Sequence, residues 1–155
     1  MPCNFSVTIN GQVFAMDTAD PTCSVTPSTT LNDFLRHQTP FHGTRVSCNE
    51  GGCGSCTVAL TFTDPTTQKS VTRAINSCLA PLLSLNGLSV TTNEGTTTDA
   101  THKQVQSTLA EYNGTQCGYC SSGMVMAMWS MLQENANPTQ AEIEAMLDGN
   151  LCRCT

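Results

Sequence analysis

The chain has 155 residues, of which only 12% are charged, and its formal net charge at pH 7 is −6. An acidic chain without a basic run is not expected to bind nucleic acid or an anionic membrane, since both attract clustered lysine and arginine. No apolar run approaches the ~18 residues of a membrane helix. The length suits one ordinary domain or two small ones, and the scarcity of charge favours a surface partly covered by other protein.

The chain contains ten cysteines, and their number narrows the possible functions. Ten thiols in a chain that shows no secretory signal indicate metal binding inside the cell, so we expect a cytoplasmic protein and not a disulfide scaffold. Cys3 and Cys23 fall outside any ligand spacing and are expected to be free thiols. His37, His42 and His102 lie near no second His or Cys at ligand spacing, and we expect them to be surface or capping groups.

Residues 1–92 are rich in predicted β-strands. Apolar and polar residues alternate over 5–9, the dipeptide Asn10-Gly11 favours a type I′ hairpin, and a second strand returns over 12–16. The other expected elements are a short helix at 32–37, strands at 57–62, 70–75 and 88–91, and a helical turn at 81–85. A small mixed sheet with one or two helices over a face is the expected architecture.

Four cysteines of this half are candidate ligands of one metal centre: Cys48, Cys53, Cys56 and Cys78. The first three have the C-x4-C-x2-C spacing that is typical of plant-type [2Fe–2S] ferredoxins. The loop that carries them also contains Gly51, Gly52 and Gly54, which permit a positive φ and a close approach of the backbone to a cluster. Structural zinc is the alternative, but zinc sites usually have two C-x2-C pairs, so the spacing favours iron.

Residues 93–100 show no periodicity and predict a linker, beyond which the pattern becomes helical over 101–155. Helices are expected over 102–112 and 122–132. A third helix is expected to begin with a capping box of Thr139 and Glu142 and to stop at Gly149.

Four more cysteines flank these helices: Cys117, Cys120, Cys152 and Cys154. Two close pairs supply enough ligands for a second cluster, and thiols at a helix N-terminus are biased toward the thiolate that binds metal. The spacing alone leaves iron–sulfur and zinc equally open. The motif C-G-Y-C also suits a thioredoxin-like oxidoreductase, but that fold needs a βαβ context that these flanking helices do not provide.

A ferredoxin loop followed by the motifs at 116–120 and 149–155 resembles the iron–sulfur region of the molybdenum hydroxylases, the xanthine dehydrogenase and aldehyde oxidase family. The resemblance implies an α+β chain with a β-grasp ferredoxin-like domain at 1–92 and a four-helix-bundle domain at 101–155. Each domain would hold one [2Fe–2S] cluster on its four cysteines. Gln116 and Cys154 would contact molybdopterin on a partner domain, and Gly51 and Gly52 would face FAD.

The function implied by this resemblance is electron transfer, with no catalytic residue in this chain. Electrons from the oxidation of an aldehyde or N-heterocycle would pass from molybdopterin through the two clusters to FAD. The molybdopterin and FAD domains would be its partners, in the same chain or in other subunits of an enzyme that we expect to be a homodimer. Asn49, Ser55 and residues 114–116 favour the aldehyde oxidase branch.

The chain is expected to be a fragment of a longer polypeptide, with its helical domain truncated at the C-terminus, and the alternative is an unusually short small subunit. Two functions of other classes are the alternatives. One is a free-standing ferredoxin-type carrier, and the other is a zinc-stabilised interaction module.

Overall fold

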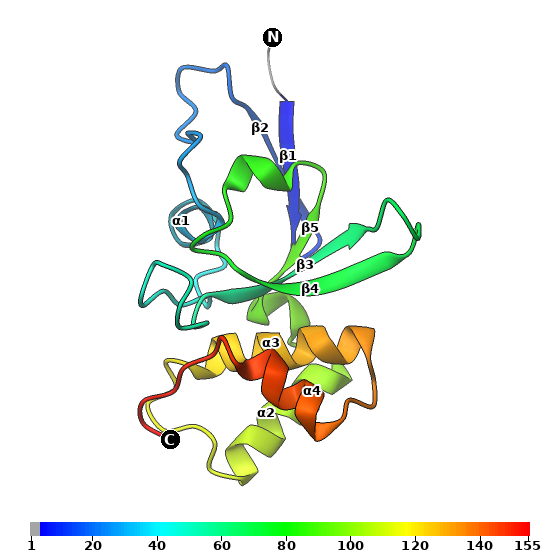
Figure 1. Ribbon diagram of the computed structural model, residues 1–155. Helices are drawn as coiled ribbons and strands as arrows, with labels where there is room; N and C mark the ends of the chain where they lie inside the picture. The colour runs from blue at the N-terminus through cyan, green and yellow to red at the C-terminus, as the bar shows by residue number, and fades with distance from the viewer. Residues whose placement is uncertain (1–3) are drawn as a thin grey trace.

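The computed structural model describes residues 4–155, in which one mixed five-stranded sheet and four α-helices form an α+β fold, as predicted (Figure 1). The strands follow the order β2-β1-β5-β3-β4 across the sheet. Only the β1–β5 pair is parallel among the described strands. The strands are β1 (Asn4–Ile9), β2 (Gln12–Asp17), β3 (Thr57–Thr63), β4 (Ser70–Asn76) and β5 (Ser89–Thr91).

The helices divide between the two halves of the chain. Helix α1 (Leu31–Gln38) and the 3-10 helix η1 (Leu82–Leu85) belong to the first half. The second half contains the 3-10 helix η2 (Asn93–Thr96) and the α-helices α2 (Ala100–Glu111), α3 (Ser121–Glu134) and α4 (Gln140–Leu147). Among residues 4–155, no helix is long and apolar enough to cross a membrane.

The first hairpin forms as its turn residues predict. Asn10 and Gly11 both have positive φ angles, 52° and 81°, which is the backbone conformation of a type I′ turn. The turn sets the register in which Ile9 lies opposite Gln12. Alternate residues of β1 then point into the core, where Phe5 and Val7 are buried.

The main core lies between the sheet and α1. Helix α1 begins with a capping box in which Thr30 accepts a hydrogen bond from the Asp33 amide. Its apolar side buries Leu31, Phe34 and Leu35 against the strands. This core holds the sheet on which the first cysteine loop is mounted.

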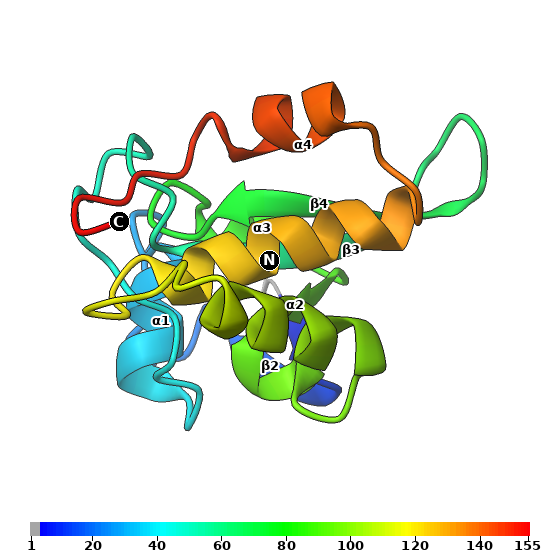
Figure 2. The same ribbon diagram turned by 90° about the horizontal axis from the view of Figure 1, so that it is seen from below.

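The three helices of the second half cover the β3–β4 end of the sheet. Helix α3 packs on both strands, with α2 and α4 on either side of it (Figure 2). Ala59 of β3, Met126 and Trp129 form a second buried cluster at this contact. Helix α4 begins with the predicted capping box of Thr139 and Glu142.

Residues 93–96, predicted to be part of an irregular linker, form η2 instead. Their polar side chains form hydrogen bonds with residues of both halves of the chain, and these bonds hold the segment in place. The Glu94 carboxylate accepts hydrogen bonds from the Gly43 amide and the Thr92 hydroxyl, both at 2.6 Å. The Asn93 side chain donates to the Ser122 carbonyl at 3.1 Å. The two halves are therefore joined by a structured connection.

The prediction that His102 is a surface or capping group is wrong. His102 lies in the first turn of α2 with only 1% of its surface exposed, and its Nε2 is 3.2 Å from Asn93 Oδ1. Burial lowers its pKa, and the nearby Asp99 carboxylate offsets this only in part. The imidazole is therefore a neutral part of the junction between η2 and α2. His37 and His42 lie at the surface as predicted.

Asp99 joins two helices, and its removal tests the packing of the second half. Its Oδ1 accepts hydrogen bonds from the His102 amide at 2.8 Å, which caps α2, and from Trp129 Nε1 at 3.0 Å. We expect Asp99→Ala to cost about 1 kcal/mol for the lost cap and about 1–3 kcal/mol for the indole left without its acceptor. Urea unfolding of the variant measures both losses together.

The matched control is Asp99→Asn, which keeps the accepting oxygen but cannot ionise. The hydrogen bond from the His102 amide lowers the pKa of Asp99 from its ordinary value of 3.8. A lowered pKa stabilises the fold above the unfolded-state value, and that stability is lost as the pH falls through the folded-state value. The advantage of Asp99 over asparagine should therefore shrink below about pH 4. An advantage that grows with acidity would contradict this assignment.

Candidate metal centres

The first thiol set, Cys48, Cys53, Cys56 and Cys78, gathers at one end of the β3–β4 hairpin. Cys56 directly precedes β3 and Cys78 follows β4, and the antiparallel pairing of Thr57 with Asn76 brings these two cysteines together. Cys56 and Cys78 are buried, whereas Cys48 and Cys53 are half-buried on the loop. The Ser77 hydroxyl donates to the Cys56 carbonyl at 2.7 Å and fixes this end of the hairpin.

The loop between Cys48 and Cys56 uses the left-handed backbone conformation at three residues. Asn49, Gly51 and Gly54 have φ angles of 55°, 76° and 67°. The Asn76 side chain donates to the Gly51 carbonyl at 3.0 Å and holds the loop against the hairpin. Gly52, expected to use the same freedom, does not have a left-handed φ, whereas Asn49, not predicted to do so, does.

The pKa values of the first set reflect the crowding of its thiols. Burial raises the pKa of Cys53, but hydrogen bonds from Ser55 and from Cys48 outweigh it and lower the pKa to about 7. Burial raises the pKa of Cys78 to about 11, and the adjacent Cys56 thiol contributes to the rise. One thiol is thus ready to bind a cation, while another keeps its proton until a metal displaces it.

The second set, Cys117, Cys120, Cys152 and Cys154, joins the start of α3 to the segment after α4. The Sγ atoms of Cys117 and Cys154 lie 3.5 Å apart. Cys120 is the N-cap of α3 and is hydrogen-bonded through its thiol to Cys152. Cys117 and Cys154 are exposed and the other two are half-buried. Residues separated by more than thirty positions therefore meet as two thiol pairs.

Hydrogen bonds within this second set shift its pKa values in opposite directions. The Thr155 hydroxyl, followed by the Thr155 amide and the Cys120 thiol, lowers the pKa of Cys152 to about 7. The Tyr119 amide lowers the pKa of Cys117, while the neighbouring Cys117 raises that of Cys154. Burial is the main cause of the raised pKa of Cys120. As in the first set, a thiol with a pKa of about 7 lies beside a thiol whose pKa is raised.

The donor chemistry of both sets fits a [2Fe–2S] cluster. Each set offers four thiols arranged as two neighbouring pairs, and each iron of such a cluster takes two protein ligands. Within residues 4–155, no three His, Cys, Asp or Glu side chains surround a single metal position. A cluster of two irons does not require such a group, because its ligands are shared between two metal ions. Cys23 lies apart from both sets, beside the main core, and Cys3 is outside the described residues.

Several polar groups lie beside the thiols, although the sequence analysis predicted no contact between them and the cysteines. Ser55 Oγ lies 3.2 Å from Cys53 Sγ, and Thr155 Oγ1 lies 2.9 Å from Cys152 Sγ. The Tyr119 hydroxyl donates to the Val46 carbonyl, and its ring lies 5.7 Å from the Arg45 guanidinium. Ser55 and Thr155 each lie within three positions of a ligand cysteine. A hydroxyl residue at such a position is the signal that could have indicated both contacts, since such groups tune metal sites.

The predicted cofactor contacts lie beside these sets. Gln116 directly precedes Cys117 and is exposed. Cys154, in the segment after α4, is also exposed. Gly51 and Gly52 are in the first cysteine loop, where Leu79 approaches Gly51 closely. What these residues would contact on another domain stays a prediction.

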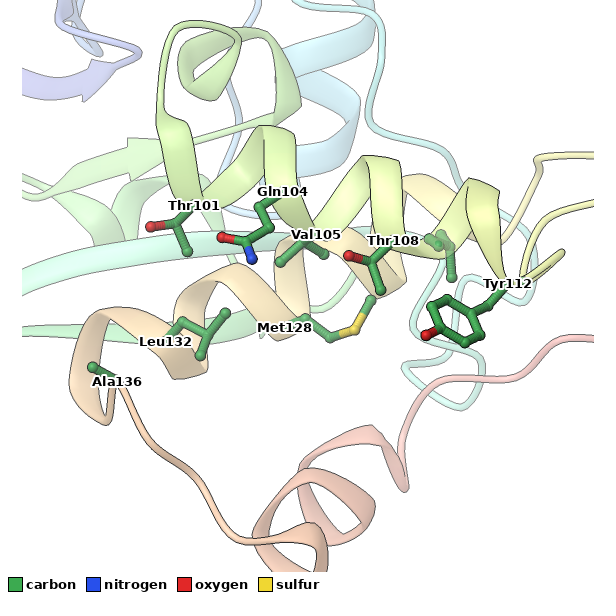
Figure 3. A pocket seen from close by; sticks show the side chains of 10 residues that line it. Thr101, Gln104, Val105, Thr108, Tyr112, Met128, Leu132 and Ala136 are labelled. Atoms are coloured by element: carbon green, nitrogen blue, oxygen red, sulfur yellow. The ribbon is translucent and has the colours of Figure 1, made fainter.

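A separate groove of about 570 Å³ runs between α2 and α3 (Figure 3). Its walls include Val105, Met128 and Leu132, with Tyr112 at one end. None of its lining residues is a cysteine, histidine or charged group. We therefore assign the chemistry of the chain to the two thiol sets and not to this groove.

Comparison with known proteins agrees with two metal-binding domains. Residues 14–83 match the 2Fe-2S iron-sulfur cluster binding domain, and residues 92–155 match the [2Fe-2S] binding domain. The chain is 42% identical over 147 residues to xanthine dehydrogenase/oxidase of Rattus norvegicus, covering 95% of this chain and 11% of that protein. It is 44% identical over 133 residues to aldehyde oxidase 2 of the same organism, covering 85% of this chain and 10% of that protein.

A solved structure has the same fold over nearly the full chain. The chain resembles a chain of quinoline 2-oxidoreductase from Pseudomonas putida 86 with a TM-score of 0.74 and 30% sequence identity, covering 99% of this chain and 85% of that one. The sequence therefore spans about a tenth of its full-length relatives but most of this shorter one. The chain belongs to the molybdenum hydroxylase family, in which it corresponds to the iron–sulfur region that functions in electron transfer.

Proposed function

We propose that this chain is the electron-transfer module of a molybdenum hydroxylase that oxidises an aldehyde or N-heterocycle. The first thiol set, Cys48, Cys53, Cys56 and Cys78, and the second, Cys117, Cys120, Cys152 and Cys154, would each hold one [2Fe–2S] cluster. When bound, each cluster supplies a centre that accepts and releases one electron. The order would run from a molybdopterin domain to the second set, then to the first set and to an FAD domain.

The observation that carries this proposal is the gathering of eight cysteines into two sets of paired thiols. Each set has a thiol whose pKa is about 7, Cys53 in the first and Cys152 in the second, so each has a ligand that is partly ionised near neutral pH. The buried residues Cys56 and Cys78 exclude water from one side of the first site. The exposed Cys117 and Cys154 leave the second site open to a partner domain.

Partner domains and assembly belong to the same proposal. Gln116 and Cys154 would meet molybdopterin, and the loop of Gly51 and Gly52 would face FAD, in a cytoplasmic enzyme that forms a homodimer. The division into a β-grasp domain at 1–92, a linker at 93–100 and a helical domain at 101–155 is supported by the change of architecture at η2. Three α-helices lie in the described part of the helical domain, and we propose that it is a four-helix bundle in the complete enzyme.

The zinc-stabilised module is the second candidate, because four thiols can also hold a structural zinc ion. The free-standing carrier is the third. The similar identities to xanthine dehydrogenase/oxidase and to aldehyde oxidase 2, 42% and 44%, do not favour either branch of the family. The preference for the aldehyde oxidase branch therefore stays a prediction from Asn49, Ser55 and residues 114–116.

A redox titration of the purified chain with its native metal content tests the proposed function. Two one-electron centres in different surroundings should take up about two electrons per chain and give two distinct paramagnetic signals, since hydrogen bonds and exposure set cluster potentials. A chain that takes up no electrons, as a zinc protein would, contradicts the proposal. Uptake of about one electron would leave only a ferredoxin-type carrier.

A further inference from the structure

The peptide at Gly54 in the first cysteine loop is enclosed by two segments of the helical half. Gly123, in the first turn of α3, lies so close that a Cβ atom added to it would be 2.0 Å from the Gly54 carbonyl oxygen and 2.9 Å from Ser55 Cα. Cys120 of the second thiol set is the N-cap of α3. The contact at Gly123 therefore places this part of the second set directly beside the loop that carries the first set.

The second segment follows α4 and carries Cys152 and Cys154. It contacts the same loop. The Leu151 amide donates to the Cys53 carbonyl at 2.9 Å, and the Asn150 side chain donates to the Gly54 carbonyl at 3.1 Å. Leu151 directly precedes Cys152, so one hydrogen bond joins the backbone of a candidate ligand in the first set to the neighbour of one in the second. Figure 2 shows the C-terminal segment running beside the loops of the first half.

We propose that Gly123, Asn150 and Leu151 form a clasp around the Cys53–Gly54 backbone that fixes the separation of the two iron–sulfur centres. The inference rests on the proposed function and deepens it by naming its positioning residues. Electron exchange between two centres weakens steeply as they move apart, so such a pair has to be held rigidly by its supporting residues. Both segments that carry the second thiol set, the start of α3 and the segment after α4, contact the Cys53–Gly54 backbone. These contacts therefore control the distance between the second set and the first.

Gly123→Ala adds a side chain where the clasp has no room. Alanine is a better helix former than glycine, so the substitution does not weaken α3 itself. Its Cβ instead meets the Gly54 backbone and has to push the loop and helix apart. We expect the variant to keep the iron content of the unsubstituted chain but to show a weaker magnetic interaction between the two reduced centres, measured as spin–spin splitting in the paramagnetic spectrum.

The matched control is Gly149→Ala. It adds the same methyl group next to Asn150, but its Cβ meets no atom within 4 Å and its backbone is not left-handed. The magnetic interaction should be unchanged in this control. An unchanged interaction in a fully loaded Gly123→Ala chain would overturn the proposal.

Asn150→Ala decides the matter if Gly123→Ala fails to fold or to load. It removes one hydrogen bond to Gly54 without adding an atom, and we expect a weaker interaction with full iron content. An unchanged interaction would then overturn the clasp. Incomplete iron loading of the unsubstituted chain would reject the proposed function itself, and the clasp with it, so the two failures are distinguishable.

Discussion

Cys152→Ser should halve the iron content of the chain and remove one of its two reduced-cluster signals. Cys152 has a thiol pKa of about 7, and its Sγ is hydrogen-bonded to Thr155 and to Cys120, so it is partly ionised near neutral pH. Its loss breaks the second set, while the four thiols of the first set lie on the β3–β4 hairpin and the loop before it and stay in place. We expect about two irons per chain with the signal of the first centre retained.

Cys23→Ser is the control for this substitution. Cys23 packs beside the main core, away from both thiol sets, so the variant should keep about four irons and both signals. Loss of both signals in a Cys152→Ser chain that remains folded by circular dichroism would contradict two independent sites. The fold has to be checked because metal binding and folding are coupled.

Gly54→Ala should strongly destabilise the iron-loaded chain. Its φ of 67° disfavours a side chain by roughly 1–2 kcal/mol. Its Cβ would also lie 2.5 Å from Asn150 Nδ2 and 2.6 Å from the Gly149 carbonyl oxygen. Overpacking of this kind adds about 1–3 kcal/mol. We expect the thermal midpoint to fall by roughly 10 °C for a chain of this size.

Gly11→Ala separates the two causes. Gly11 has a φ of 81° in the first hairpin turn, but nothing lies within 4 Å of its added Cβ. Only the backbone strain remains, and the midpoint should fall by about 3 °C. Equal losses in the two variants would mean that crowding of the added methyl group by Gly149 and Asn150 adds no cost beyond the backbone strain.

The sequence predicted the elements well because their signals are local. Alternation located β1, the Asn10-Gly11 dipeptide located its hairpin, and the capping box of Thr139 and Glu142 located the start of α4. The thiol spacing likewise predicts that the cysteines of the first loop act together. All of these signals lie within a few residues of the structure that they describe.

Contacts between the two halves could not be predicted in the same way. Helical periodicity places Gly123 on a face of α3, but it does not tell which loop that face meets. The folding of residues 93–96 into η2 likewise depends on Gly43 of the first half and on Ser122 of α3, and the burial of His102 depends on its contact with Asn93 of η2. A glycine in the first turn of a helix was the local sign of the close approach, and it becomes interpretable only with its neighbour known.

The most direct test of the account is a chemical count of iron, acid-labile sulfide and zinc in the purified chain. Eight thiols in two sets predict about four irons and about four sulfides per chain, with no stoichiometric zinc. Zinc in place of iron, or only about two irons in the unsubstituted chain, would contradict the assignment of two [2Fe–2S] centres.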